Sequence, residues 1–272
     1  MGETATRQRL EQVLRELGPL AVAVSGGVDS LTLAHLAHGV LDGDFEAFHA
    51  ISPAVPPEAS ERVRRHASRF GWRLEVVDAG EFRDPAYLAN PANRCFFCKF
   101  NLYGAIQERT RARIASGTNL DDLSDFRPGL EAAEKHGVAH PYVVAEIDKD
   151  GVRQLAREMG LDDLAELPAA PCLSSRLQTG IRVTASALAF VHEIERLVGA
   201  ALKPQTVRCR IRRDGVAVEL DPESLALITA PAGAPLRRHL HHLCARHGHA
   251  QAPRFLPYRR GSAFERAPAH AV

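Results

Sequence analysis

The pattern of apolar and polar positions predicts alternating helices and strands in the first half of the chain. Apolar residues recur at helical spacing over 4–17, and the run of five apolar residues at 20–24 is typical of a short buried strand. This β-α-β-α-β order is the signature of a parallel sheet covered by helices. The other elements expected here are strands at 45–52, 72–78 and 113–116 and a charged amphipathic helix over 57–70.

The next part of the chain is less regular. Helices are expected over 131–136 and 148–159, with a short strand at 140–144 between them. Residues 161–183 are irregular and contain several prolines, which indicates a connection between domains. We therefore place a domain boundary near Thr179 and expect domains 1–178 and 179–272.

The pattern beyond this boundary predicts a small α+β domain. Thr184 is expected to cap a helix, and two strands at 206–212 and 216–220 surround an Asp-Gly dipeptide that is typical of a hairpin turn. A helix over 235–247 and a last strand at 254–258 complete the domain.

The composition is that of a globular protein, with 272 residues, 45% hydrophobic and 25% charged. None of its apolar segments is long enough to span a bilayer, and the first residues have the pattern of a charged amphipathic helix, not of a signal peptide. We therefore expect a cytoplasmic protein that has no membrane partner.

The net charge is close to neutral but unevenly distributed. The whole chain carries +1, which argues against dedicated nucleic-acid binding. Residues 201–272, however, contain eleven Arg and one Lys against five acidic residues, a net charge of +7. Arginine can donate two hydrogen bonds to one phosphate or carboxylate, so this segment suits an anionic ligand. Arginine is also abundant in the rest of the chain, so a bias of composition explains the excess equally well.

Residues 25–30, SGGVDS, follow the strand at 20–24 directly and precede a helix. At such a turn several backbone N–H groups point to one place, and the helix dipole adds partial positive charge. The glycines allow close approach of an anion, the serines add hydroxyl donors, and the aspartate suits a Mg²⁺ that bridges phosphate oxygens. The alternative is an ordinary tight turn with a capping aspartate. The candidate polyphosphate contacts are Ser25, Gly26, Gly27, Asp29 and Ser30.

A second polar turn is expected at the same edge of the sheet, after the strand at 113–116. In an open parallel sheet, ligands bind beyond the carboxyl ends of the strands, so this turn should lie beside residues 25–30. The acidic residues would contact ribose or metal, and the arginine would neutralise phosphate. The alternative is a capped turn that begins a helix. The candidates are Gly117, Thr118, Asn119, Asp121, Asp122 and Arg127.

The five cysteines are an odd number in a long chain, which favours ligands, nucleophiles or packing residues over disulfides. Cys95 and Cys98 form a C-x₂-C pair at the start of an expected helix, whose dipole favours thiolates. Cys172 lies in a polar loop, whereas Cys209 and Cys244 lie on apolar faces. The first three suit a [4Fe–4S] cluster with one iron that has no protein ligand. The alternatives are that Cys172 is itself the sulfur donor or nucleophile, or that the three are unrelated.

Arg208 and Arg210 lie two residues apart on an expected strand and therefore share a face. Together with Arg176 they would hold a phosphate group of a substrate, the alternative being a solvated basic strand. Glu195 and Glu219 are expected to be surface charges of a helix and a strand.

The order of these motifs resembles the LarE family, the ATP-dependent sulfur transferases of nickel-pincer nucleotide biosynthesis. The motifs are SGGVDS, RCFFCK, SGTNLDDLSDFRPGL, PCLSSR, VRCR and YRRGS, and the resemblance runs from about residue 5 to about residue 262. SGGVDS is shared by all PP-loop ATP pyrophosphatases, whereas SGTNLDD and PCLSSR are specific to this family. The resemblance implies an α/β fold: a parallel-sheet PP-loop domain, of the adenine nucleotide alpha hydrolase-like type, with a small α+β C-terminal domain.

The resemblance also implies the reaction. ATP would adenylate a carboxylate of pyridinium-3,5-biscarboxylic acid mononucleotide with release of pyrophosphate, and a sulfur species would then displace AMP to give a thiocarboxylate. In one subgroup the cysteine that matches Cys172 gives up its own sulfur; in another, cysteines that match Cys95, Cys98 and Cys172 hold an iron–sulfur cluster, and this chain matches the second pattern. The implied partners are the nucleotide substrate, sulfide or a sulfur-donor protein, and further copies of the chain in a hexamer.

The residue roles implied by the resemblance follow the same motifs. Cys172 and Asp29 would be catalytic, and Glu195 and Glu219 match acidic positions associated with metal binding. The substrate phosphate would contact Arg176, Arg208 and Arg210. ATP and Mg²⁺ would contact Ala23, Ser25, Gly26, Gly27, Asp29, Ser30, Gly117, Thr118, Asn119, Asp122 and Arg127.

Three other functions remain open. A PP-loop tRNA thiolase is supported by the basic segment 201–272 and opposed by the near-neutral whole chain. An amide-forming ligase would use ammonia on the adenylate and would need no cysteine trio. A nucleotide-binding or metal-storage protein would release no pyrophosphate in response to a substrate.

Overall fold

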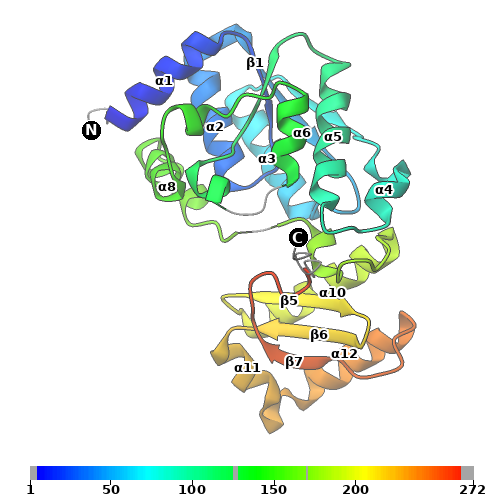
Figure 1. The fold of residues 1–272 in the computed structure, drawn as a ribbon. Helices are drawn as coiled ribbons and strands as arrows, with labels where there is room; N and C mark the ends of the chain where they lie inside the picture. The colour runs from blue at the N-terminus through cyan, green and yellow to red at the C-terminus, as the bar shows by residue number, and fades with distance from the viewer. Residues whose placement is uncertain (1–4, 125–127, 170, 265–272) are drawn as a thin grey trace, which may run out of the picture. The chain divides into compact units, whose positions relative to one another are not determined.

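The chain forms two compact units (Figure 1). The structure, a computed structural model, describes residues 5–124, 128–169 and 171–264. Unit 1 comprises Met1–Asp84 and Asn93–Ala170, and unit 2 comprises Pro85–Ala92 and Pro171–Val272. The division therefore falls shortly before the expected boundary at Thr179. It also assigns to unit 2 a short segment that the sequence pattern places in the first domain.

A parallel sheet of four strands, in the order β3-β2-β1-β4, forms the centre of unit 1. Leu20 pairs with Phe45 on one side and with Arg113 on the other, so β1 lies between β2 and β4. Because the chain adds β2 and β3 on one side of β1 and β4 on the other, the topological switch point lies at the carboxyl ends of β1 and β4. The expected parallel α/β fold is thus confirmed. The strands are β1 (Leu20–Ala23), β2 (Phe45–Ala50), β3 (Leu74–Val77) and β4 (Arg113–Ser116).

Helices cover both faces of this sheet (Figure 1). Side chains of β1 point alternately to the two faces, so Leu20 packs with Leu33 on one side and Ala21 packs with Ile106 on the other. The first face is covered by α1 (Ala5–Leu17), α2 (Val28–Leu41), α3 (Pro57–Phe70) and α8 (Lys149–Glu158), and the second by α5 (Arg94–Gln107) and α6 (Pro128–Lys135). Two short helices, α7 (Pro141–Val144) and α9 (Asp162–Ala165), complete the unit.

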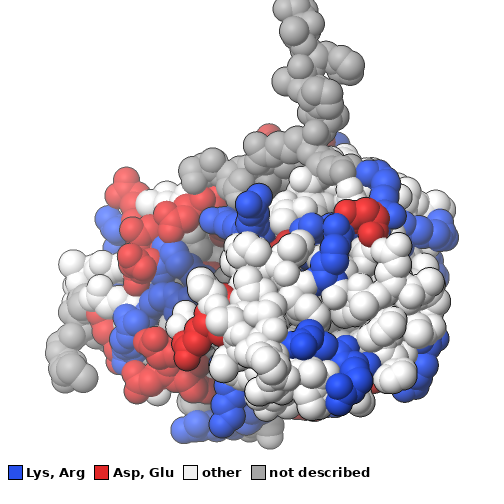
Figure 2. All heavy atoms as spheres, turned by 90° about the horizontal axis from the view of Figure 1, so that it is seen from below, with Lys and Arg blue, Asp and Glu red and all other residues white. Residues whose placement is uncertain are grey.

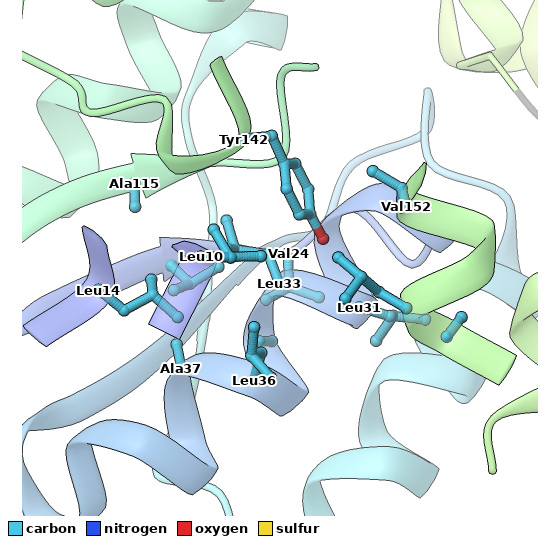
Figure 3. Packing of buried hydrophobic residues seen from close by; sticks show 14 of the residues in the cluster. Leu10, Leu14, Val24, Leu31, Leu33, Leu36, Ala37, Ala115, Tyr142 and Val152 are labelled. Carbon is cyan, nitrogen blue, oxygen red and sulfur yellow. The ribbon is translucent and has the colours of Figure 1, made fainter. Parts of the chain in front are cut away.

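The helix α2, which follows the SGGVDS loop, is buried on most of its circumference. Its apolar residues pack against α1, α8 and the sheet, and Figure 3 shows Leu31 and Leu33 among these neighbours. The ring of Tyr142 enters the same cluster with its hydroxyl directed toward the start of α2 (Figure 3), where that hydroxyl donates to the backbone oxygen of Asp29 at 3.0 Å. The first turn of α2 is therefore held by packing over its whole length, which makes the preceding loop a fixed feature.

A histidine pair inside unit 1 predicts a pH-dependent stability. Nε2 of His35 lies 2.8 Å from Nδ1 of His66, with Phe70 and Trp72 packed around them. Burial, and then the neighbouring His66, lowers the pKa of His35 from 6.5 to about 3. Because the unfolded state binds this proton more readily, the stability is full above pH 6.5 and falls as the pH drops toward 3, at up to about 1.4 kcal/mol per pH unit. Urea unfolding between pH 7 and 4 should show this slope, and His35→Gln should reduce it. An equal reduction in the exposed control His241→Gln would contradict the prediction.

Unit 2 is the expected small α+β domain. Its sheet has the order β5-β6-β7, with β5 and β6 antiparallel and β6 and β7 parallel. The hairpin turns where the Asp-Gly dipeptide predicts it, and Thr184 caps α10 by accepting from the backbone N–H of Ala187 at 3.2 Å. The elements are α4 (Pro85–Leu88), α10 (Ala185–Leu202), β5 (Val207–Arg212), β6 (Gly215–Leu220), α11 (Pro222–Thr229), α12 (Ala234–Arg246) and β7 (Arg254–Pro257).

Two expectations about local structure are wrong. The segment 140–144, expected as a strand, is the helical turn α7. The chain makes its last sheet contact at Ala139, through a bridge to Ala115, and Pro141 then sets a φ that starts a helix. The helix α11 was not expected, although Asp221 before Pro222 is a typical helix start, and its side chain accepts from Ser224 N–H at 3.0 Å. None of the described helices is long and apolar enough to cross a membrane.

Candidate active site

The SGGVDS loop is held together by its second serine. Ser30 Oγ accepts from the backbone N–H of Ser25 at 3.0 Å, donates to the carbonyl of Gly27 at 3.2 Å and lies 3.1 Å from Ser25 Oγ. The residue at the N-cap of α2 is Gly27, which makes no side-chain cap in the described structure, and Asp29 lies inside the first turn. The loop is therefore not a turn capped by Asp29. It leaves the N–H groups at the start of α2 directed outward, as an anion site requires.

Gly26 is required by the shape of this loop. Its φ is +86°, and a Cβ on it would lie 2.7 Å from the carbonyl oxygen of Ala59 in α3. An L-residue would meet both the left-handed backbone and this carbonyl.

We expect Gly26→Ala to lower the free energy of unfolding by about 1–2 kcal/mol from the backbone conformation alone, and to weaken ATP binding because the loop must shift. Urea denaturation and calorimetric titration measure the two effects. Gly39→Ala is the matched control, because a Cβ there meets nothing within 4 Å and the position lies inside α2. It should stabilise the protein by about 0.5–1 kcal/mol. Equal effects of the two changes would refute the requirement.

The carboxylate of Asp29 is the meeting point of groups from three parts of unit 1. Lys149 Nζ donates to its two oxygens at 2.7 and 2.6 Å, and Asn119 Nδ2 donates at 3.1 Å. Tyr142 holds the backbone of the same residue; burial, and then the charge of Asp29, raises the pKa of this tyrosine well above its usual value, so its hydroxyl remains a donor. The carboxylate and the ammonium are each about 30% exposed, so a ligand can reach both. Such a pair provides an oxygen ligand for Mg²⁺ and a cation for phosphate in one place.

The second turn lies directly on the start of α2, as the sheet topology predicts. A Cβ on Gly117 would lie 2.8 Å from the backbone of Asp29 and Ser30, so only glycine allows this approach. The following residues form the 3₁₀ turn Leu120–Ser124. Its Asp121 accepts from the backbone N–H of Lys149 at 3.1 Å and so ties this turn to the start of α8.

The hydroxyl of Thr118 belongs to a chain of polar groups at the end of β4. Ser116 Oγ lies 3.0 Å from Thr118 Oγ1 and 2.9 Å from Nδ1 of His140. Burial, and then Lys99, lowers the pKa of His140, so this ring is neutral near pH 7. The chain orients Thr118 at the sheet edge where the two loops meet. Among the other predicted nucleotide contacts, Ala23 is the last residue of β1, Asp122 accepts from the backbone N–H of Asn119 at 3.2 Å, and Arg127 lies outside the described residues.

The cysteines fall into two groups. Cys95, Cys98 and Cys172 are half-buried, whereas Cys209 and Cys244 are fully buried. Burial raises the pKa of Cys209 well above its usual value and that of Cys244 to about 11, so both remain neutral thiols that pack in the core.

The C-x₂-C pair lies in the first turn of α5, as expected, and Cys172 immediately precedes the 3₁₀ turn Leu173–Arg176 in unit 2. Within the described residues, no three His, Cys, Asp or Glu side chains form a group that could hold a metal ion. The thiols of the predicted cluster belong to different units, and the cluster stays a prediction.

Arg176 and Arg210, predicted to contact a substrate phosphate, are buried in unit 2 and pair with carboxylates. Arg176 donates to both oxygens of Glu195 at 2.9 Å, and Arg210 donates to Glu219 at 3.1 Å. Glu195 and Glu219 are therefore not surface charges, and Glu219 is 1% exposed. Their sequence pattern misled because the partner arginines are distant in sequence or opposite in the hairpin. A metal-binding role for these two carboxylates stays a prediction.

Arg176 also fixes the loop that carries Cys172. Its Nη1 donates to the carbonyl of Pro171 at 2.7 Å and to that of Cys172 at 3.3 Å. Arg208 is more exposed and lies with its guanidinium 6.0 Å from the ring centre of Tyr258. Burial, and then the charge of Arg176, lowers the pKa of Arg208. An added anion at Arg208 would relieve this repulsion, which keeps the substrate-phosphate role as a prediction for this arginine above all.

Sequence reasoning missed Lys149, the closest partner of Asp29. It is the first residue of α8, after the N-cap Asp148. A cation is unfavourable at the positive end of a helix, so its position was a usable signal for a function outside that helix. Tyr142 carries no such signal, because the hydrogen bond of a buried tyrosine depends on the tertiary fold.

The parallel sheet, the SGGVDS loop at its switch point and the groups around Asp29 are the features of a PP-loop α/β domain. No family model matches the chain. It is 37% identical over 222 residues to slr1717, an uncharacterized protein of Synechocystis sp., which covers 80% of this chain and 82% of that protein. The chain therefore belongs to the same family as slr1717.

Two further relatives carry names of enzymes. The chain is 28% identical over 230 residues, 82% of each chain, to the pyridinium-3,5-bisthiocarboxylic acid mononucleotide synthase of Lactiplantibacillus plantarum. It is 26% identical over 184 residues to a chain of the glutamine-hydrolyzing GMP synthase of Thermococcus kodakarensis, and this match spans 60% of the present chain and 58% of that relative.

Proposed function

We propose that the chain is an ATP-dependent sulfur transferase that converts a carboxylate of pyridinium-3,5-biscarboxylic acid mononucleotide into a thiocarboxylate. The observation that carries the proposal is the convergence of Gly117, Asn119 and Lys149 on Asp29 at the SGGVDS loop. This arrangement suits a nucleotide triphosphate and its metal ion. The similarity to the pyridinium-3,5-bisthiocarboxylic acid mononucleotide synthase supports the choice of substrate.

The residues around Asp29 fit Mg²⁺, which prefers carboxylate and phosphate oxygens. Asp29 would hold the ion, and Lys149, which now donates to that carboxylate, would turn to the phosphates. Mg²⁺, when bound, neutralises charge on the phosphate oxygens. The backbone N–H groups of Gly27 and Val28 and the hydroxyls of Ser25 and Ser30 would orient the same phosphates.

The proposed reaction has two halves. In the first, a substrate carboxylate oxygen attacks the α-phosphorus of ATP, the bond to the bridging oxygen breaks, and pyrophosphate leaves. In the second, a sulfur nucleophile attacks the acyl carbon of the adenylate, and AMP leaves with the carboxylate oxygen. Adenylation makes the second half possible because AMP is a better leaving group than oxide.

The sulfur half is assigned to Cys95, Cys98 and Cys172. Two half-buried thiols at the positive end of α5 and a third in a loop fixed by Arg176 are suited to soft metal ligation. A [4Fe–4S] cluster on these three thiols, when bound, would supply an iron that can carry an additional sulfide. The alternative is that Cys172 gives up its own sulfur. Sulfide or a sulfur-donor protein would restore the sulfur, and a homo-hexamer is proposed from the family resemblance.

The experiment that tests the function follows pyrophosphate and product together. The anaerobically purified protein is incubated with ATP, Mg²⁺ and the biscarboxylic mononucleotide. We expect substrate-dependent release of pyrophosphate and AMP and a product in which sulfur replaces one oxygen. Pyrophosphate release without sulfur in the product, but with ammonia incorporated, would identify the amide-forming ligase. Absence of substrate-dependent release would refute both enzymes.

A tRNA thiolase is the second candidate, favoured by the net charge of +7 over residues 201–272. On the face drawn in Figure 2, basic and acidic side chains lie intermixed on one side, and basic groups on the other are separated by uncharged surface. Extended phosphate backbones prefer a continuous basic surface. Binding of tRNA that weakens steeply between low and moderate salt would support this candidate over the small-molecule substrate.

A further inference from the structure

The SGGVDS loop is held from outside by the helix α3, which contributes no residue to the predicted nucleotide site. Arg62 of α3 donates from Nη1 to the carbonyl oxygen of Gly26 at 2.7 Å. One turn earlier, the carbonyl of Ala59 lies so close to Gly26 that no side chain fits there. Two contacts from one helix thus meet a single peptide unit of the loop.

A buried relay holds the preceding peptide unit in a similar way. His49 of β2 lies with Nδ1 2.7 Å from the carbonyl oxygen of Val24 and with Nε2 2.9 Å from Ser60 Oγ in α3. A carbonyl can only accept, so Nδ1 carries the hydrogen and Nε2 accepts from the serine. Burial lowers the pKa of His49, which keeps the ring in this neutral form. The carbonyls of Val24 and Gly26 are therefore both fixed by side chains outside the loop.

The geometry of the peptide bond converts a held carbonyl into an aimed N–H group. The carbonyl of Gly26 and the N–H of Gly27 belong to one planar trans unit and point in opposite directions. With the oxygen held toward α3 by Arg62, the hydrogen must point away from α3. Within the described residues this N–H makes only a long contact, 3.4 Å to Ser25 Oγ, which is easily exchanged for a stronger acceptor.

The charge of Arg62 acts in the same direction as its geometry. A cation on a carbonyl oxygen polarises the peptide and makes its N–H a stronger donor. It also places positive charge close to the loop. The guanidinium is partly buried: burial, and then Arg65, lowers its pKa, but an arginine retains its proton at neutral pH. Holding a buried cation on a neutral carbonyl costs desolvation free energy, which a bound anion would offset.

We propose that Arg62 is a positioning residue that aims the Gly27 N–H at the pyrophosphate portion of ATP. The inference rests on the proposed function, because it assumes that this loop binds phosphate groups. Arg62 would contact no ligand itself. It would act through the Gly26–Gly27 peptide, and it would affect ligands with phosphate groups and not those without them.

The test compares Arg62→Met with the control Arg65→Met, which removes the same charge from an exposed position of the same helix. Pyrophosphate with Mg²⁺, ATP and adenosine are titrated calorimetrically. We expect Arg62→Met to weaken pyrophosphate and ATP binding about 10- to 100-fold, the range for a charge-assisted hydrogen bond, with adenosine binding unchanged. Arg65→Met should change each by less than about threefold.

A second readout reports on the aimed group itself. In ¹H–¹⁵N spectra, the Gly27 amide of the unmodified protein should shift strongly downfield on addition of pyrophosphate, and this shift should be reduced in Arg62→Met but not in Arg65→Met. If Arg62→Met does not fold, Arg62→Gln is compared in the same way. Unchanged pyrophosphate binding, or an equal loss of adenosine binding, would overturn the inference. Failure of the unmodified protein to bind any phosphate ligand would instead overturn the proposed function.

Discussion

Asp29→Asn should reduce substrate-dependent pyrophosphate release by about 100-fold or more. The change preserves shape and the hydrogen bond with Asn119 or Lys149 in part, but it removes the negative charge that Mg²⁺ requires. It also leaves Lys149 without its ion-pair partner, so the ammonium would bind phosphate in the ground state without a metal beside it. We therefore expect kcat to fall far more than the affinity for ATP.

The measurement is a coupled pyrophosphate assay over a range of ATP and Mg²⁺ concentrations. Asp44→Asn, which removes the same charge from an exposed turn after α2, is the control and should leave the rate unchanged within about twofold. A partial return of activity with Mn²⁺, which binds neutral oxygen ligands more tightly than Mg²⁺, would support a metal-binding role for Asp29. Full activity of Asp29→Asn would contradict the proposed site.

The nucleotide loop was predictable from sequence because its determinants are local. A strand of five apolar residues followed by SGGVDS defines the turn, and the apolar helix after it follows from the same stretch. The contact of Gly117 with this loop was also predictable, because strand order in a parallel sheet brings carboxyl ends to one edge. Lys149 and Arg62 could not be derived in this way. Each reaches the loop from a helix whose rotation and distance depend on the packed tertiary fold.

The arginines of unit 2 illustrate the opposite error. Alternation on a strand correctly predicts that Arg208 and Arg210 differ in direction from Cys209, but it does not reveal how deeply a face is buried. Glu219 lies on the paired strand and accepts from Arg210 and Arg212 together, so the hairpin itself neutralises its charge. Charge counts along a sequence therefore overstate the positive surface of this segment, because part of the charge is consumed inside the unit.

Cys172→Ser should abolish sulfur transfer while substrate-dependent pyrophosphate release continues. The two halves of the proposed reaction use different groups: Asp29 and its neighbours serve adenylation, and the thiols serve sulfur delivery. A serine hydroxyl preserves the size of the side chain but neither carries transferable sulfur nor ligates iron well. The expected product is thus an adenylate that is released or hydrolysed to AMP and the original carboxylate. Mass spectrometry of the product and a pyrophosphate assay measure both halves in the same reaction.

The same variant, together with Cys95→Ser, separates the two sources of sulfur. If the three thiols bind one cluster, both variants should lose iron and acid-labile sulfide after anaerobic purification, both should lose sulfur transfer, and the unmodified protein should keep its mass after turnover. If Cys172 is sacrificed, Cys95→Ser should still complete one turnover, and the unmodified protein should lose the mass of H₂S. Cys244→Ala is the control, because this thiol is buried in unit 2 and its raised pKa keeps it protonated. Sulfur transfer that survives Cys172→Ser would refute both sources, and since adenylation needs no thiol, it would point to a sulfur nucleophile that attacks the adenylate directly from solution.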